Sequence, residues 1–142
     1  MKESKYELKN WKRWKHTVVL LNNTKEQLEN KKNDLYIDNN HNQIVKKINN
    51  LMEECKQYDQ IIFYYQFFIQ RLECAINDLL NEEEKICVLI YANDPDNSSK
   101  REYSALEKGI SRTTYYKILS NACNKLDKVL APNVNQHSTK EL

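Results

Sequence analysis

The feature that most constrains this chain is a long, unbroken repeat of apolar side chains between residues 44 and 79. The repeat alternates steps of four and three residues for five heptads, which is the spacing of a coiled-coil seam. Its members are Ile44, Ile48, Leu51, Cys55, Tyr58, Ile62, Tyr65, Ile69, Leu72, Ile76 and Leu79. Each buried seam side chain contributes roughly 1.5–3 kcal/mol, so the seam must be covered. The sequence therefore predicts one long helix that requires a partner.

A second helix is predicted near the start of the chain, from about Glu7 to Asp34. Its apolar residues also recur at coiled-coil spacing: Trp11, Trp14, Val18, Leu21, Leu28 and Leu35. The turn-forming segment 36–42 separates the two helices and favours an antiparallel hairpin. Isoleucine opposite leucine or tyrosine also suits a coil between two chains. Pairing within the chain and a homodimer through Ile44–Leu79 are both open.

Three aromatic residues of the long helix, Phe63, Tyr64 and Phe67, lie off the seam. A cluster of exposed rings requires a second surface. The sequence offers two such surfaces, the C-terminal part of the chain and another subunit.

Composition supports an all-α fold. The 142 residues include a single glycine and two prolines, whereas an all-β fold needs many turn residues. No run of apolar residues approaches the roughly 18 that a membrane span needs, and no signal peptide precedes the first helix. We expect a cytoplasmic protein, in a bacterial host, that does not enter a membrane.

No pattern indicates catalysis, a metal site or a cofactor. The four cysteines are widely spaced, lack any CxxC pair and are expected to be free thiols in a reducing cytosol. The acids Glu82, Glu83 and Glu84 begin a helix, where negative charge complements the helix dipole. We expect a protein that is not an enzyme.

The sequence divides into an interaction region at 1–78, a three-helix module at 79–131 and a disordered tail at 132–142. In the module, Asn81 is predicted to cap a helix with Glu84 at its third position. That helix is expected to bury Ile86, Leu89 and Ile90, with Cys87 or Val88 at the margin of the buried face, and to end before Asp94-Pro95-Asp96. Ser99–Glu102 is similar to a capping box for a shorter helix that ends at Gly109.

Gly109 is the only glycine in the chain and marks a position that requires a positive φ. Ser111 then caps a final helix, and Ile110 and Tyr115 form its hydrophobic staple. The side chains expected to pack inward are Tyr115, Ile118 or Leu119, Ala122, Leu126 and Val129. The side chains expected to face outward are Arg112, Thr113, Tyr116, Lys117, Ser120 and Asn121. This outline predicts a helix-turn-helix.

The outward side chains have the chemistry that a helix in the major groove needs. A guanidinium can bind guanine bidentately, and hydroxyl and amide groups can bind base edges or phosphates. Between residues 98 and 130 seven basic and three acidic residues give a local charge of 7 − 3 = +4. Double-stranded DNA is therefore the expected partner. The basic residues around Trp11 and Trp14 offer a further phosphate contact, although the tryptophans fit the seam better.

The segment from Leu79 to Leu130 resembles region four of bacterial sigma factors. LLNEEEKICVLIY is similar to the opening helix of that region, and GISRTTYYKILSNACNKL is similar to its recognition helix. The middle helix departs from the pattern at Ser104, and the Asp-Pro-Asp loop before it is longer. The layout of a helical front and this tail resembles the ArpU and RinA groups of phage late transcription regulators. That resemblance implies an activator of phage or mobile-element late genes.

Two functions follow from these patterns. The first is a transcription regulator that binds a specific DNA sequence through residues 111–130. The alternative is a coiled-coil interaction protein that docks on RNA polymerase or another regulator without contacting DNA. A mixed role is also open, because sigma region four itself contacts polymerase.

Overall fold

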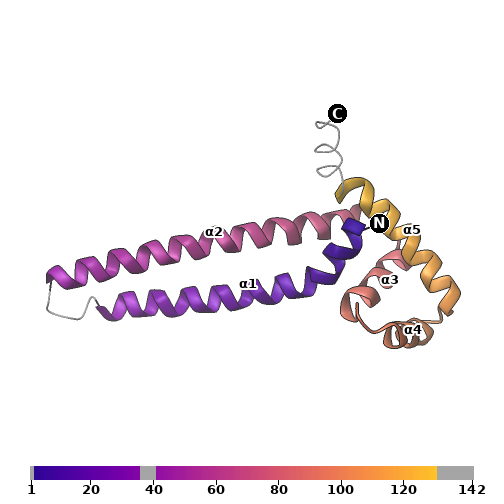
Figure 1. Cartoon of the computed structure of the whole chain (residues 1–142), viewed down its shortest axis with the longest axis horizontal. Coiled ribbons are helices and arrows are strands. Elements are labelled where there is room, and N and C mark those ends of the chain that lie inside the picture. Colours follow the sequence, from indigo (N-terminus) through magenta and orange to yellow (C-terminus); the bar gives the residue numbers. More distant parts are fainter. Residues whose placement is uncertain (1, 36–40, 131–142) are drawn as a thin grey trace. The chain divides into compact units, whose positions relative to one another are not determined.

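The computed structural model describes residues 2–35 and 41–130, and within these ranges it consists of α-helices without a β-strand (Figure 1). The helices are α1 (Lys2–Leu35), α2 (His41–Leu79), α3 (Glu82–Asn93), α4 (Ser98–Glu107) and α5 (Arg112–Leu130). The all-α class predicted from the sequence is confirmed. The predicted tail at 132–142 and most of the predicted turn, residues 36–40, lie outside the described residues.

The described residues form two compact units, and both long helices contribute to each. The first unit contains the described residues of Met1–Arg13 and of Ile69–Leu142, and the second contains those of Trp14–Phe68. The ranges 1–78 and 79–131 stay a prediction about domain organisation.

In the second unit the predicted seam of α2 is covered within one chain. Ile44, Ile48 and Ile62 are buried, and the intervening seam residues are half-buried. The rings of Trp14 and Phe68 lie 5.9 Å apart, and Lys25 forms an ion pair with Asp59. The two contacts join α1 and α2 in opposite sequence order, so the helices run in opposite directions here. Lys25 interrupts the apolar stripe of α1 and is accommodated by this ion pair.

The core of the first unit draws on every helix. Its fully buried side chains include Leu8 of α1, Leu72 of α2, Val88 of α3, and Tyr115 and Leu126 of α5. Ala105 of α4 is also fully buried in this cluster. The three shorter helices therefore enclose a core to which the first turns of α1 also contribute.

The first helix begins earlier than predicted, at Lys2 rather than near Glu7. Ser4 and Leu8 precede Trp11 at steps of four and three residues, and both are fully buried, so the repeat extends toward the N-terminus. The backbone N–H of Ser4 donates to Asp127 Oδ1 at 3.0 Å. These contacts stabilise the first turns of α1. The apolar pattern used for the prediction began at Trp11 and did not include them.

An ion pair lies beside this part of α1. Arg71 Nη2 lies 2.8 Å from Glu7 Oε2, and the Glu7 side chain is 4% exposed. Burial raises the pKa of Glu7, and the charge and hydrogen bond of Arg71 only partly offset that rise. About one helical turn after Glu7, Trp11 Nε1 donates to Glu73 Oε2 at 3.1 Å. Both predicted tryptophans of the seam thus contact α2.

Two apolar positions differ from the sequence prediction. Leu79 is 38% exposed although it completes the heptad repeat, because α2 ends there and Leu80 is buried instead. In α3 the side chains of Cys87 and Val88 are fully buried, whereas Leu89 is 46% exposed. The run from 86 to 90 is apolar throughout, so its pattern does not define which side of α3 packs against α4 and α5.

The caps of the shorter helices were predicted with mixed success. Asn81 and Glu84 form the predicted reciprocal capping box of α3. The predicted box at Ser99–Glu102 is wrong, since Asn97 caps α4 by accepting from the Lys100 N–H at 3.1 Å. The Arg101 guanidinium donates to the carbonyls of Asp94 and Pro95 at 2.9 and 2.8 Å. Those bonds fix the loop before α4, and this makes Asn97 the residue at the start of the helix.

Candidate nucleic-acid interface

The turn between α4 and α5 has the geometry expected around Gly109. Gly109 has a φ of 78°, and no other described residue has a positive φ. Its N–H donates to the Leu106 carbonyl at 2.9 Å, and the N–H of Ile110 donates to the Ala105 carbonyl at 2.9 Å. This pair of bonds is a Schellman motif, which ends a helix with a left-handed residue. The helix α4 therefore ends abruptly, and only Ile110 and Ser111 separate Gly109 from the first residue of α5.

Ser111 begins α5. Its Oγ accepts from the Thr114 N–H at 3.3 Å and donates to Thr114 Oγ1 at 2.8 Å. Its carbonyl accepts from the Tyr115 N–H at 2.8 Å. Ile110 packs against the core cluster that contains Tyr115, as a hydrophobic staple requires.

The inner face of α5 matches the prediction except at its end and at Cys123, which is buried in addition. The buried side chains are Tyr115, Leu119, Ala122, Cys123, Leu126 and Leu130. Between the two alternatives at 118 and 119, Leu119 is the buried one. Val129 was predicted to pack inward but is 44% exposed, and Leu130 takes that place. Steps of three and four residues that start at Leu119 can reach either Val129 or Leu130, so the spacing does not decide between them.

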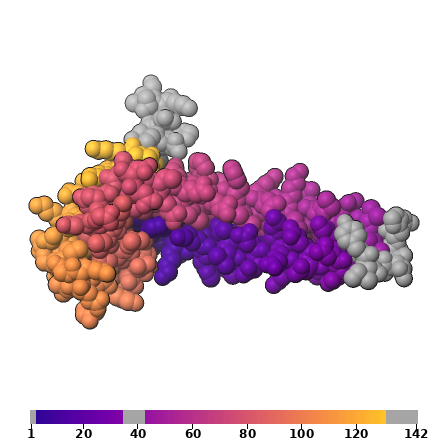
Figure 2. Space-filling model, turned by 180° about the vertical axis from the view of Figure 1, so that it is seen from behind, coloured from indigo at the N-terminus to yellow at the C-terminus, as the bar shows by residue number. Residues whose placement is uncertain are grey.

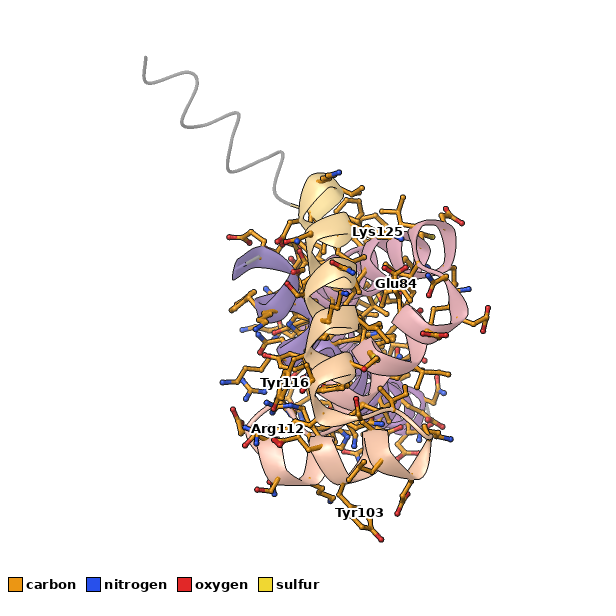
Figure 3. The ribbon with its side chains drawn as sticks, turned by 90° about the vertical axis from the view of Figure 1, so that its right-hand side faces the viewer. Glu84, Tyr103, Arg112, Tyr116 and Lys125 are labelled. Atoms are coloured by element: carbon orange, nitrogen blue, oxygen red, sulfur yellow. The ribbon has the colours of Figure 1, made fainter. Side chains whose placement is uncertain are left out.

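The outer face of α5 presents most of the predicted DNA-facing side chains to solvent. Arg112, Thr113, Lys117 and Asn121 are exposed, while Tyr116 and Ser120 are half-buried. Figure 3 shows Arg112 and Tyr116 near the start of α5, beside α4. The predicted set therefore lies along one helix face, with its cationic side chains in the first two turns.

Glu102 of α4 is the residue at this face that the sequence reasoning missed. Its Oε1 lies 2.9 Å from Arg112 Nε, and its Oε2 accepts a hydrogen bond from the Tyr116 hydroxyl at 3.1 Å. The Glu102 side chain is 21% exposed and that of Arg112 is 75% exposed. One carboxylate thus positions two side chains of the predicted reading face. The position of Glu102 in the sequence did not indicate these contacts, because only the crossing of α4 and α5 brings the two helices together there.

A second carboxylate ties α3 to the later turns of α5. Glu84 Oε1 accepts from Lys125 Nζ at 2.8 Å and from the Asn81 N–H at 2.9 Å (Figure 3). Burial acts to raise the pKa of Glu84, but the bonds from Lys125 and Asn81 outweigh it, so the net pKa lies below its ordinary value. Lys125 counts toward the local basic charge, yet its ammonium is engaged in this contact.

Two of the free cysteines, Cys87 and Cys123, are buried. In the part of the chain that the structure describes, no three His, Cys, Asp or Glu side chains gather as a metal site would require. Burial, with the charges of Glu83 and Glu84, raises the pKa of the Cys87 thiol to about 11. Burial also raises the pKa of Cys123. None of the described helices has the length and apolar character to cross a bilayer.

No family model, curated protein or solved structure matches this chain.

Proposed function

We propose that this protein is a sequence-specific DNA-binding regulator of transcription, in which α4 and α5 form a helix-turn-helix and α5 reads the major groove. In this proposal α1 and α2 form an antiparallel hairpin that serves as the interaction region. The resemblance to sigma region four and to the ArpU and RinA groups further suggests activation of phage or mobile-element late genes.

The observation that carries the proposal is the junction of α4 and α5. A Schellman turn at Gly109 is followed at once by the Ser111 cap, and a polar face led by Arg112 begins there. The N-terminus of a helix also favours a phosphate. Because Arg112 is bonded to Glu102 through Nε, the terminal nitrogens of its guanidinium can still bind O6 and N7 of a guanine.

A selection experiment tests this function without a known operator. The full chain is incubated with a pool of random duplex DNA, and the enriched sequence is compared with a scrambled one by fluorescence anisotropy at several salt concentrations. We expect enrichment of one sequence and a linear fall of log affinity with log salt. A pool that shows no enrichment would count decisively against direct, specific DNA binding.

Two variants separate base contacts from phosphate contacts in that experiment. Arg112→Ala should reduce the preference for the enriched sequence by about 1–3 kcal/mol, the discrimination that one bidentate contact provides. Lys117→Ala should weaken binding to both sequences alike, because phosphate contacts carry no sequence information. An unchanged preference in Arg112→Ala would contradict its assigned role.

The alternative function, docking on RNA polymerase without DNA contact, is favoured by one observation on α4. Tyr103 and Leu106 are 63% and 60% exposed, and Tyr103 extends away from the helices in Figure 3. Exposed apolar side chains of this size suit a protein partner. Repeating the DNA selection with purified polymerase distinguishes these cases. Enrichment without polymerase supports direct DNA binding, and enrichment only in its presence supports the mixed role. No enrichment in either experiment supports docking without DNA contact.

A further inference from the structure

We infer that the aromatic patch of α2, which we define as Phe63, Tyr64 and Phe67, binds the same patch of a second copy of this chain with the two helices antiparallel. This contact differs from pairing through the seam. The buried seam residues Ile48 and Ile62 are covered within a single chain, so they offer no free surface to another copy. The aromatic patch is what α2 leaves uncovered.

The patch is exposed, and two of its three rings contact Phe68. Phe63, Tyr64 and Phe67 are 71%, 62% and 54% exposed. The rings of Tyr64 and Phe67 lie 4.8 and 5.6 Å from that of Phe68, which itself contacts Trp14. Rings already ordered by their neighbours lose less entropy when a partner binds. Figure 2 shows that the side chains of α2, in pink and magenta, form an open surface along the helix.

The sequence around the patch explains why the occupant is a second copy. Residues 60–70 read QIIFYYQFFIQ, in which three of the five pairs about Tyr65 are identical: 60/70, 61/69 and 63/67. In an antiparallel pair centred there, Phe63 of one copy lies opposite Phe67 of the other, and Gln60 lies opposite Gln70. A two-fold contact requires such self-complementarity, because each residue meets the same surface on the partner.

Charge and area agree with this contact. Residues 60–70 contain no charged side chain, in a chain of which 30% is charged, so pairing desolvates no ion there. At about 200 Å² for each aromatic side chain, the three exposed fractions leave on the order of 400 Å² per copy. A standard interface buries about 800 Å² per partner, of which somewhat over half is apolar. The patch therefore supplies most of the apolar area that a stable dimer needs.

Sedimentation equilibrium of the full chain at roughly 100 μM tests the inference. We expect the mass of a dimer for the natural chain and of a monomer for the double variant Phe63→Gln/Phe67→Gln, with equal helix content by circular dichroism. The control variant Val19→Gln/Leu20→Gln changes two residues of α1 that are 55% and 51% exposed, and it should remain dimeric. A monomeric natural chain, or a patch variant that still dimerises, overturns the proposal.

Spin labels determine the direction of pairing. Lys56 lies nine residues before Tyr65, so labels on Lys56→Cys are about 27 Å apart along the helix axis in the antiparallel dimer. Cys55 and Cys74 are replaced by serine so that only the new thiol is labelled. A parallel dimer would place the two labels side by side, and that result would refute the antiparallel arrangement.

Discussion

Arg112 Nε lies 2.9 Å from Glu102 Oε1, so the first cation of α5 is held by an acid of α4. The same carboxylate accepts a bond from the Tyr116 hydroxyl. An acid near a phosphate backbone opposes binding, whereas a side chain fixed in one orientation favours discrimination between bases. In the proposed DNA-binding function, Glu102 would therefore lower the general affinity for DNA and raise the selectivity between sequences.

Replacing Glu102 with alanine should separate those two effects. We expect non-specific DNA to bind a few-fold more tightly at low salt, since one negative charge is gone, and this gain should shrink as salt is added. The preference for the enriched sequence should fall, because Arg112 and Tyr116 lose the atoms that orient them. Anisotropy titrations on specific and scrambled duplexes measure both quantities.

The matched control is Glu107→Ala, which removes an exposed acid from the same helix. It should raise non-specific affinity in the same way and leave the preference unchanged. If both variants keep the full preference, Glu102 does not position the reading face.

Gly109→Val should destabilise the turn through backbone conformation alone. Nothing lies within 4 Å of a Cβ at this position, so the penalty of roughly 1–2 kcal/mol arises from the positive φ. DNA binding should weaken because the angle between α4 and α5 shifts, while the helix content of residues 44–79 persists. Thermal unfolding and anisotropy measure these effects. Asparagine tolerates the left-handed region better than valine, so the stability and DNA affinity of Gly109→Asn should lie between those of the natural chain and of Gly109→Val.

Leu126→Ala and Val129→Ala should differ sharply in their effect on unfolding. Leu126 is fully buried, and its truncation should lower the free energy of unfolding by about 2–5 kcal/mol. Val129 is 44% exposed, and its truncation should cost less than about 1 kcal/mol. Urea denaturation monitored by circular dichroism measures both, and equal losses would mean that α5 is rotated from the position described.

Acid should weaken the contact between α3 and α5 through Glu84. Because the pKa of Glu84 is lower in the folded chain than its ordinary 4.5, ionised Glu84 stabilises the fold above pH 4.5. That contribution is lost as the pH falls through the folded pKa. Glu84→Gln should therefore flatten this part of the stability profile against pH, whereas Glu83→Gln, an exposed neighbour, should leave it unchanged.

The sequence predicted those features that depend on neighbours along the chain. The capping box of Asn81 and the positive φ of Gly109 follow from patterns within a few residues, and the heptads of α2 follow from a regular repeat along one helix. The α4 cap was misplaced because the loop anchored by Arg101 shifts the start of the helix to Asn97. Leu79 and Val129 were misplaced because both lie where a helix ends, and there the repeat no longer determines burial.

Contacts between helices could not be predicted in the same way. Glu102 meets Arg112 and Tyr116 only because α4 and α5 cross at the Gly109 turn, and no spacing in the sequence encodes that crossing. The exposure of the aromatic patch could be anticipated, since Phe63, Tyr64 and Phe67 lie off the seam. What remained open was whether another part of the chain covers them.

The burial of Leu8 beside Leu72 and Leu126 has a consequence for synthesis of the protein. The ribosome synthesises α1 before α5, and the core that receives Leu8 is incomplete until α5 has been made. In the interval Leu8 and the first turns of α1 lack their final neighbours. The unit that carries the Gly109 turn is thus expected to fold only after α5 has left the ribosome.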